Sequence, residues 1–363
     1  MVKKKQTTIT ELAKAAGVSI STVSRVLNNK QYVSDKTRKK VEAAIADLNF
    51  QPDQNARGLR GVPSNLVALV IPDILNVYYT TLAKEIEGQL QEKGYTMLLG
   101  ITHDQSDLLQ EYLEKFSKIN LDGLIYVPPP DKATSPYIRG LARMGMPILE
   151  INRRRERDLF FGVEPDNFGA VVQALEHLHA LGHHKIGFIV GSQETTTGSQ
   201  RLEGYRFFMN KYGIKSMPEL VKIGNFSREY GEQATREILN LTGDEYPSAV
   251  FATSNRLLMG TISVLKEKDI KVPDDLSVIA MDDAEWLEEF SPSITTVDVA
   301  IDQMAALTVD LLMSRIHADD KFESPRTYTL STSLKERNSC KDIGKLSEGY
   351  HVSERSVYWI KEK

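Results

Sequence analysis

The 363-residue sequence predicts two unlike parts, an N-terminal all-α helix-turn-helix domain and a larger α/β region with two parallel-sheet lobes. A Gly-Val-Ser turn at residues 17–19 separates two short stretches with helical apolar spacing, which is typical of a helix-turn-helix. From Leu66 onward, short apolar runs alternate with helical stretches, and this alternation predicts parallel sheets covered by helices. The charge is also divided: residues 1–63 carry 12 Lys/Arg against 5 Asp/Glu, or +7, and the rest carries 33 against 44, or −11. A basic head on an acidic body indicates that only the head meets a polyanion.

The cysteine count and the pattern of apolar residues exclude several classes of protein. Cys340 is the only cysteine, so an internal disulfide and a Cys-rich zinc site are excluded. No N-terminal stretch has the pattern of a signal peptide, and no run reaches the ~18 apolar residues of a transmembrane helix. We therefore expect a cytoplasmic protein with no membrane partner, no bound metal and no other cofactor.

Three capped helices are predicted in the head. The first begins after Thr8, because Thr8-Ile9-Thr10-Glu11 is a capping box, and it ends at Gly17. Ser19 caps the second helix, and Ser34 caps the third, which covers residues 35–48. A head of this size buries only a small core and is expected to be marginally stable alone. The predicted core residues are Leu12, Ala13, Ala16, Val23, Val26, Leu27, Val41, Ala44, Ile45 and Leu48.

The second helix is the predicted DNA-reading element. Its N-terminal residues Ile20 and Ser21 point away from the core and suit base edges, and Arg25 can bond a guanine bidentately. The remaining predicted DNA contacts have hydroxyl or amide side chains of the kind that suits phosphates, and they are Thr8, Ser19, Thr22, Ser24 and Asn28. The alternative is that the hydroxyl residues only cap helices and Arg25 only faces solvent.

A short linker helix is predicted after the head, within "NFQPDQNARGLRGVPSN". Pro52 and Asp53 suit the start of a helix, and Pro63 with Ser64 marks a domain boundary. The helix is short, polar and interrupted by Gly58, so it is expected to be unstable alone.

The stretch from Thr8 to Arg60 resembles the DNA-binding head and hinge of the lactose/galactose-repressor (LacI/GalR) family. The matching residues read "TITELAKAAGVSISTVSRVLNN" and "VSDKTRKKVEAAIADLNFQPDQNARGLR". The resemblance implies a homodimer whose two heads read a near-palindromic double-stranded operator, with hinge helices that order on the DNA. It makes Ile20, Ser21 and Arg25 the base readers and assigns Asn55, Ala56 and Leu59 to the hinge. Leu59 would be an apolar wedge in the minor groove, since it has nothing nearby to pack against as a core residue.

Eight strands are predicted in the body, in two series separated by helical stretches. The first series covers residues 66–71, 96–100, 123–127 and 147–151, with helices near 78–92, 107–118 and 135–144. The second series covers residues 185–190, 219–223, 248–252 and 276–281. Two such series imply two similar lobes with a ligand crevice beyond the carboxyl ends of the strands.

The body has no recognisable catalytic or nucleotide-binding motif. "IPDILN" follows the first strand, where a dinucleotide fold needs a Gly-rich turn, and "GSQETTTG" is neither a GxGxxG nor a Walker loop. His183 and His184 in "LGHHK" cannot easily converge on one metal ion, and a helix C-terminal cap is the better interpretation. The body is therefore predicted to bind and not to catalyse, with a solute-binding protein and a sugar-processing enzyme as rival classes.

The body is similar to the periplasmic-binding-protein-like effector domain of the same family, from about Asn65 to Arg337. Stretches such as "LGHHKIGFIVG", "SQRLEGY" and "LSVIAMDD" support the similarity. It implies a head at 1–52, a hinge at 53–63, an effector-binding and dimerisation domain at 64–339 and a tail at 340–363. Three crossings are implied, with the N-terminal lobe at about 64–163 and 293–325 and the C-terminal lobe at about 164–292 and 326–339.

The resemblance also implies an effector pocket. Arg201 offers a planar fork to hydroxyls or a carboxylate, Asp282 accepts sugar hydroxyls, and Phe226 stacks on a sugar ring. The remaining implied effector residues are Tyr78, Tyr79, Glu150 and Asn255. Phe226 and Tyr78 could instead be core residues, and Arg201 could form a surface salt bridge.

The chemical class of the effector is left open by the sequence. The run "NRRRER" at 152–157 places extra cations beside Glu150, which favours an anionic effector such as a sugar acid or sugar phosphate. A neutral sugar fits nearly as well, and a solvated loop is the simpler interpretation of the run. We expect a repressor of a carbohydrate-utilisation operon, with co-repression as the alternative. The tail lacks the leucine heptad of tetrameric members.

Overall fold

The computed structural model describes residues 7–27, 33–48, 50, 63–131, 135–317 and 324–344. Packing divides the chain into two units, Met1–Ser64 and Asn65–Lys363. The hinge residues Asn55, Ala56 and Leu59, the head residue Asn28 and the tail beyond 344 lie outside the described residues, so the predictions made for them stay predictions.

The head contains α1 (Ile9–Ala16), α2 (Ile20–Leu27) and α3 (Asp35–Asp47). The predicted capping box is present, because Glu11 N donates to Thr8 Oγ1 at 3.3 Å and Thr8 N donates to Glu11 Oε2 at 2.8 Å. Gly17 ends α1 in the left-handed conformation with φ 65°. Ser34 caps α3 as predicted by accepting from Thr37 N.

The core of the head differs from the prediction at its edge. Leu12, Val23 and Val41 are fully buried as predicted, but Leu48 is 37% exposed. Leu48 is the C-cap of α3, where the chain leaves the helix, and Phe50 returns to the core instead with 8% exposure. The core of the head is therefore closed by an aromatic residue beyond the third helix.

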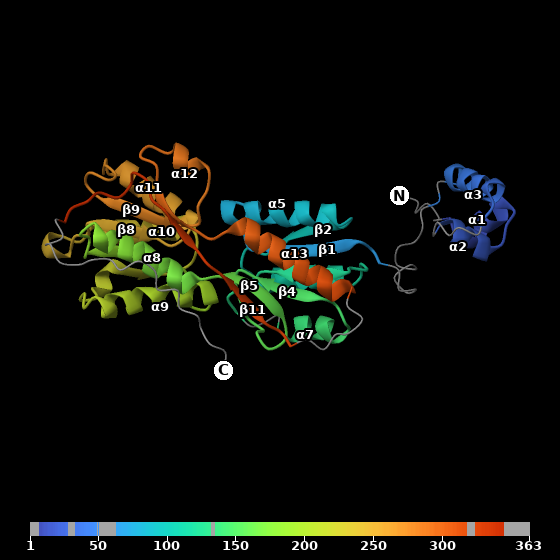
Figure 1. The fold of residues 1–363 in the computed structure, drawn as a ribbon, viewed down its shortest axis with the longest axis horizontal. Helices are drawn as coiled ribbons and strands as arrows, with labels where there is room; N and C mark the ends of the chain where they lie inside the picture. The colour runs from blue at the N-terminus through green and yellow to red at the C-terminus, as the bar shows by residue number, and fades with distance from the viewer. Residues whose placement is uncertain are drawn as a thin grey trace. The chain divides into compact units, whose positions relative to one another are not determined.

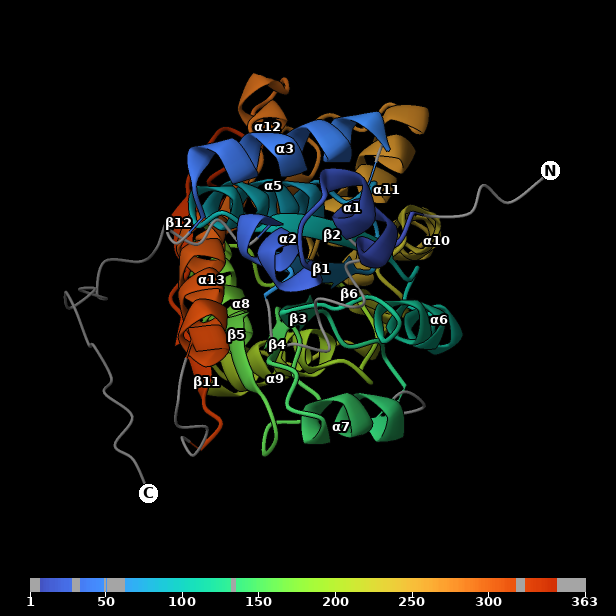
Figure 2. The ribbon, with the colours of Figure 1, turned by 90° about the vertical axis from the view of Figure 1, so that its right-hand side faces the viewer.

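The first sheet of the body is entirely parallel and has the strand order β11-β5-β4-β3-β1-β2. Its strands are β1 (Leu66–Ile71), β2 (Thr96–Ile101), β3 (Gly123–Tyr126), β4 (Ile148–Ile151), β5 (Phe161–Pro165) and β11 (Thr327–Leu330). Two helices, α5 (Val77–Glu92) and α13 (Ile301–His317), pack on one face (Figure 1). The other face is covered by α6 (Ser106–Phe116) and α7 (Ser135–Arg143), as Figure 2 shows from another side.

The second sheet has the order β12-β10-β9-β8-β6-β7, and only β12 runs antiparallel to its neighbour. Its strands are β6 (Ile186–Val190), β7 (Val221–Ile223), β8 (Ala249–Ala252), β9 (Ser277–Met281), β10 (Thr295–Asp298) and β12 (Ser333–Lys335). One face carries α8 (Asn167–Ala180) and α9 (Thr196–Lys211), and the other carries α10 (Arg228–Leu239) and α11 (Asn255–Glu267). Short helices complete the lobe: η1 (Pro218–Leu220), η2 (Gly243–Glu245) and α12 (Trp286–Glu289).

All eight predicted strands are present, but the strand predicted at 219–223 is shorter than expected. Residues Pro218–Leu220 form the helical turn η1, because proline suits the first position of a helix and has no N–H for a sheet ladder. Only Val221–Ile223 pairs with β6.

The two lobes of the body each consist of one sheet with the helices that cover it. The N-terminal lobe is the first sheet with its helices, and the C-terminal lobe is the second sheet with its helices. Within the described part of the chain, no helix is both long and apolar enough to cross a membrane.

The chain crosses between the lobes three times, but the predicted crossing points need correction. The crossings lie between β5 and α8, between β10 and α13, and between β11 and β12. The segment 293–325 was expected in the N-terminal lobe, yet β10 pairs with β9 of the second sheet. Likewise 326–339 was expected in the C-terminal lobe, yet β11 pairs with β5 of the first sheet. The chain crosses to the other lobe after Asp298, the end of β10, and after Leu330, the end of β11. Up to these residues, hydrogen bonds to the neighbouring strand satisfy the backbone N–H and C=O groups, so the strand stays in its sheet.

Candidate functional site

The exposed face of α2 carries the residues predicted to read DNA. Ile20 is 46% exposed, and Ser21 and Arg25 are exposed as well, whereas Val23 and Val26 on the opposite face are buried. Exposed residues at the start of a helix and an exposed arginine on it are suited to contacts in the major groove.

The hydroxyl residues of the head serve first as helix caps. Ser19 Oγ accepts from Thr22 N at 3.1 Å and contacts Ser21 Oγ and Thr22 Oγ1, both at 2.8 Å. Thr8 Oγ1 is 3.0 Å from Glu11 Oε2, and Ser24 is half-buried. The predicted phosphate contacts of Thr8 and Ser19 would therefore use hydroxyls that also cap helices, which suits contacts that position the head.

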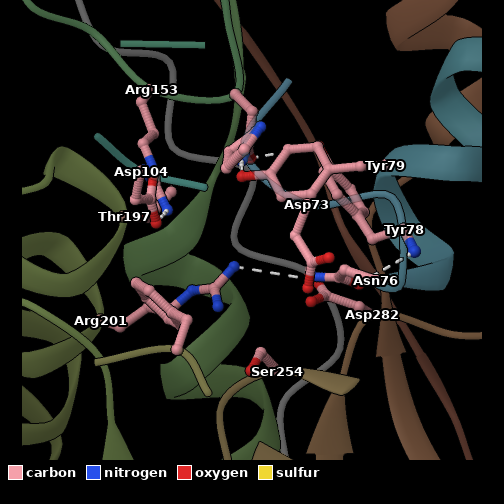
Figure 3. A pocket seen from close by; sticks show the side chains of 13 residues that line it. Asp73, Asn76, Tyr78, Tyr79, Asp104, Arg153, Thr197, Arg201, Ser254 and Asp282 are labelled. Carbon is pink, nitrogen blue, oxygen red and sulfur yellow. Dashed lines mark hydrogen bonds and ion pairs between the residues drawn. The ribbon is translucent and has the colours of Figure 1, made fainter. Parts of the chain in front are cut away.

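A second candidate site is a cleft between the lobes, with about 450 Å³ of empty space including the part open to solvent. Its lining residues come from the segments that follow β1, β2, β4, β7, β8 and β9 and from α9, so the carboxyl ends of both sheets meet here (Figure 3). This is the place where open α/β sheets bind ligands. The lining residues are Pro72, Asp73, Asn76, Tyr78, Tyr79, Asp104, Asn152, Arg153, Thr197, Arg201, Phe226, Ser254 and Asp282.

Arg201 and Asp282 lie next to each other at one wall of this pocket (Figure 3), with Nη2 and Oδ1 3.8 Å apart and both side chains nearly buried. Arg201 is held from behind, since its Nε donates to Asn167 Oδ1 at 2.9 Å and its Nη1 donates to Thr253 O. Burial raises the pKa of Asp282 against the opposing effect of Arg201, and burial lowers the pKa of Arg201. The pair thus presents a strong donor and a strong acceptor at one wall.

The facing wall is a hydrogen-bonded group of two tyrosines and an asparagine. Tyr78 Oη donates to Asn152 Oδ1 at 3.1 Å, and Asn152 Nδ2 donates to Tyr79 Oη at 2.9 Å. Burial raises the pKa of Tyr79 to about 12, so its hydroxyl stays protonated at neutral pH.

Arg153 brings a second guanidinium to the pocket, and its charge is matched. Its Nη1 and Nη2 lie 2.5 and 3.3 Å from the two carboxylate oxygens of Asp104, which form a bidentate pair. Burial lowers the pKa of Arg153, but Tyr79 and Asp104 outweigh it and the net shift is upward. Asp73, a third lining carboxylate, has an Oδ2 3.5 Å from Arg256 Nε. Each carboxylate that lines the pocket therefore faces a guanidinium.

Five of the seven effector residues expected from the sequence line this pocket, and they are Tyr78, Tyr79, Arg201, Phe226 and Asp282. The ring of Phe226 lies on Gly191, where an added Cβ would be 2.3 Å away from it. It also lies 5.7 and 5.8 Å from the guanidiniums of Arg153 and Arg201, which occupy part of the surface expected for a sugar ring.

Glu150 and Asn255 do not line the pocket. Glu150 is fully buried in the N-terminal lobe, where it accepts from Tyr126 Oη, Arg155 N and Glu156 N at 2.8, 2.8 and 2.9 Å. Asn255 is 1% exposed at the start of α11, and its backbone N–H bonds Asp282. Within the described residues its side-chain amide has no hydrogen-bond partner.

The interpretation of the run at 152–157 as a solvated loop is wrong. Arg153 and Arg154 are each 4% exposed, and Arg154 packs so closely over Gly162 that a Cβ there would overlap its guanidinium. Arg155 donates to Pro129 O at 2.9 Å and to Pro130 O.

Sequence reasoning missed several residues that line the pocket. Most follow directly after a predicted strand, and a stricter use of the strand-end rule would have found them. They are Pro72, Asp73, Asn76, Asp104, Asn152, Arg153, Thr197 and Ser254.

The two adjacent histidines point to different partners. The ring of His183 contacts Ser248 Oγ at 2.9 Å and Lys341 O at 3.0 Å, while His184 lies against His179. No cluster of three metal-ligating side chains occurs among the residues described.

Comparisons with known proteins identify relatives of both parts of the chain. The family described as "Bacterial regulatory proteins, lacI family" matches residues 8–53, and the "Periplasmic binding protein-like domain" matches residues 175–340. The HTH-type transcriptional regulator DegA of Bacillus subtilis (strain 168) is 35% identical over 302 residues, which cover 83% of this chain and 89% of DegA. The HTH-type transcriptional repressor PurR of Proteus mirabilis (strain HI4320) is 30% identical over 337 residues, which cover 92% and 97% of the two chains.

Two solved structures show the same fold over almost the whole chain. A complex of the transcriptional regulator CelR with cellobiose is 28% identical with a TM-score of 0.68, and the match covers 92% of this chain and all of that one. The lac repressor dimer bound to operator and the anti-inducer ONPF is 24% identical with a TM-score of 0.76, and the match covers 93% and 100%. DegA, PurR and CelR are all named as transcription regulators or repressors.

Proposed function

The chain belongs to the LacI family of bacterial regulatory proteins, and we propose that it is a repressor whose hold on its operator is controlled by a neutral, polyhydroxyl ligand such as a sugar. The observation that carries this proposal is the interlobe pocket, where Arg201 and Asp282 place a donor and an acceptor 3.8 Å apart among hydroxyl and amide side chains. Vicinal hydroxyls of a sugar both donate and accept, so they can satisfy such a pair together.

The charge balance of the pocket favours a neutral ligand over an anion. Asp104, Asp282 and Asp73 face Arg153, Arg201 and Arg256 respectively, so an anionic group would have to take a guanidinium from its carboxylate. A buried charge left without its partner is costly, whereas a hydroxyl can bond beside an intact pair. The cellobiose complex of CelR, a relative of the same fold, also supports a sugar.

The head supports binding to double-stranded DNA through α2. Ile20, Ser21 and Arg25 are exposed together, and the lac repressor structure of the same fold is a dimer on its operator. We propose a homodimer on a near-palindromic operator, with Asn55, Ala56 and Leu59 in a hinge that inserts Leu59 into the minor groove. A regulator of this kind acts on the chromosome, so we propose the cytoplasm as its location.

The ligand is tested first by thermal unfolding of the full chain against neutral sugars, sugar acids and sugar phosphates. A ligand at about 100 times its Kd adds ~2.7 kcal/mol to the folded state. Arg201→Ala should abolish the shift, whereas the matched control Arg206→Ala, an exposed arginine on the same helix, should keep it.

Each outcome of the panel decides between classes of ligand. A shift with a neutral sugar that requires Arg201 supports the proposal. A shift confined to sugar acids or sugar phosphates replaces the neutral class by an anionic one. If no compound of the panel shifts the unfolding transition, a carbohydrate effector is contradicted.

The DNA arm uses an operator selected from a random DNA pool. Binding should weaken steeply with salt, as for any protein that contacts phosphates through Lys and Arg. A neutral sugar from the panel should release the operator if it is an inducer and tighten it if it is a co-repressor.

A further inference from the structure

The segment Asn152–Arg157, here called the arginine loop, has contacts on three sides, and the proposed function uses only those that face the pocket. It follows β4, and its residues face the core of the N-terminal lobe, the pocket and the C-terminal lobe. We propose that the arginine loop is a latch between the lobes, which passes occupancy of the pocket on to the angle between them. This inference rests on the proposed function, because it concerns how a pocket ligand would act on the lobes.

Glu150 anchors the loop to the N-terminal lobe. Its buried carboxylate accepts from the backbone N–H groups of Arg155 and Glu156, and Tyr126 on β3 donates to it from the neighbouring strand. The Arg154 guanidinium lies 3.4 Å from the same carboxylate and donates to Phe160 O at 2.6 Å. These bonds fix the loop backbone within a low-dielectric core, so the loop moves with its lobe.

The front of the loop forms part of the pocket. Asn152 is bonded to both tyrosines of the pocket wall, and Arg153 is paired with Asp104. A molecule that fills the pocket would therefore contact Asn152 and Arg153, whose backbone leads directly into the residues that are bonded to the C-terminal lobe.

The far end of the loop is bonded to the C-terminal lobe. Arg154 N donates to Thr196 Oγ1 at 3.0 Å, and Arg155 Nη2 is 3.4 Å from Glu194 O. Thr196 is the first residue of α9, the helix that also brings Thr197 and Arg201 to the pocket. The helix α9 therefore both contacts the arginine loop and supplies residues that line the pocket.

The matched controls lie within the same two segments. Thr196→Val removes the hydroxyl that accepts from Arg154 N, and Arg155→Ala removes the guanidinium contact. Ser199→Ala removes a hydroxyl of the same helix turn, which donates to Thr195 O and Thr196 O of its own lobe. Arg157→Ala removes an arginine of the same loop, which pairs at 3.2 Å with Glu164 of its own lobe.

The test measures the distance between the lobes in the full-length protein without any added ligand. In a Cys340→Ser background, spin labels are attached at Glu114→Cys on α6 and Asp244→Cys in η2, two exposed positions of different lobes. Labelled chains are diluted with unlabelled chains, so that electron–electron distances are counted within one chain. Circular dichroism checks that each variant is folded.

We expect Thr196→Val and Arg155→Ala to broaden the distance distribution or shift it, and Ser199→Ala and Arg157→Ala to leave it as in the parent. The latch is overturned if Thr196→Val and Arg155→Ala match the parent, or if the controls broaden the distribution equally. No ligand is added, so the measured distances can be interpreted whether or not any sugar binds. A thermal-unfolding panel in which no compound shifts the unfolding transition would therefore count against the proposed function alone.

Discussion

Replacing Arg337 by alanine removes a guanidinium that ties the end of the described chain to the C-terminal lobe. Its Nη1 donates to Asp283 Oδ1 at 2.7 Å and to Ile294 O at 2.8 Å, and its Nη2 donates to Asp283 Oδ2 at 3.0 Å. The Nη2 group also donates to Glu288 at 2.8 Å. The side chains of Arg337 and Asp283 are 9% and 15% exposed, so the pair is largely shielded from water.

The expected loss of unfolding free energy is about 3 kcal/mol. Breaking a buried pair costs about 3–5 kcal/mol because the remaining charge stays unpaired. The lower end applies here, because Asp283 keeps the Thr296 hydroxyl as a donor at 2.7 Å and is partly reached by solvent. Glu288 is 64% exposed and adds little.

Lys335→Ala is the matched control, since Lys335 lies two residues away in β12. It pairs with Asp298 at 3.5 Å, with side-chain exposures of 46% and 30%. A pair this exposed contributes about 0.2–1 kcal/mol.

The assay is urea unfolding of the full chain at neutral pH, followed by the fluorescence of Trp286 on α12. Trp359→Phe removes the other tryptophan, so the signal reports the C-terminal lobe. The reasoning is refuted if Arg337→Ala costs no more than Lys335→Ala.

The pH dependence gives a second check on the same pair. Burial raises the pKa of Asp283, but hydrogen bonds from Arg337 and Thr296 outweigh it, so the net shift is downward from 3.8. The stability from this group is present above pH 3.8 and is lost as pH falls through the lowered pKa. In Arg337→Ala this acid-side loss should shrink, and an unchanged loss would contradict the assignment.

Three further predictions concern the head and the pocket. Arg25→Ala should weaken binding to a selected operator by ~1–3 kcal/mol in a titration and change binding to random DNA little, whereas equal losses on both would contradict base reading. Gly17→Ala should cost the head about 1 kcal/mol, because Gly17 has φ 65° and no atom lies within 4 Å of an added Cβ, so only backbone strain acts. Hydrogen exchange of α1 and α2 amides in the full chain measures this, and an unchanged exchange rate would argue against it. Burial raises the pKa of Asp282 from 3.8, so the stability due to this group is present below pH 3.8 and is lost as pH rises through the raised pKa. Asp282→Asn does not titrate, so the urea midpoint of the variant relative to the parent should be higher at pH 7 than at pH 4, and an equal difference at both pH values would exclude this cause.

The central strands could be predicted from the sequence because their environment is uniform. β1 and β9 are buried along nearly their whole length, and an unbroken apolar run such as "LVALVI" has few other uses. Several strands that the sequence did not predict lack such a run. β11 and β12 are half-exposed segments of four and three residues, and β5, although buried, contains glycine, glutamate and proline.

Arg201 and Asp282 were expected from the family resemblance, and they do lie 3.8 Å apart in the pocket. Assignments that depend on where a strand ends, or on a partner distant in sequence, were less predictable. Glu150 was misassigned, because it lies one residue inside the end of β4, where its side chain faces the core; Asn152, just beyond the strand, is the residue that reaches the pocket. The charge of Arg153 could not be judged from the run of arginines, since Asp104 lies 49 residues earlier.

The placement of β11 and β12 at the outer edges of the two sheets has a consequence for how the protein is made. The N-terminal lobe begins with β1, yet its sheet is finished by β11 and its face is covered by α13, roughly 250 residues later. At a synthesis rate of about 5–20 residues per second, β1 waits for roughly 10–50 s before its lobe can close. During that time β5 has an open edge that can pair with another chain. A nascent chain of this kind is therefore most exposed to aggregation before its last strands are made, and a truncation before Thr327 would leave both sheets incomplete.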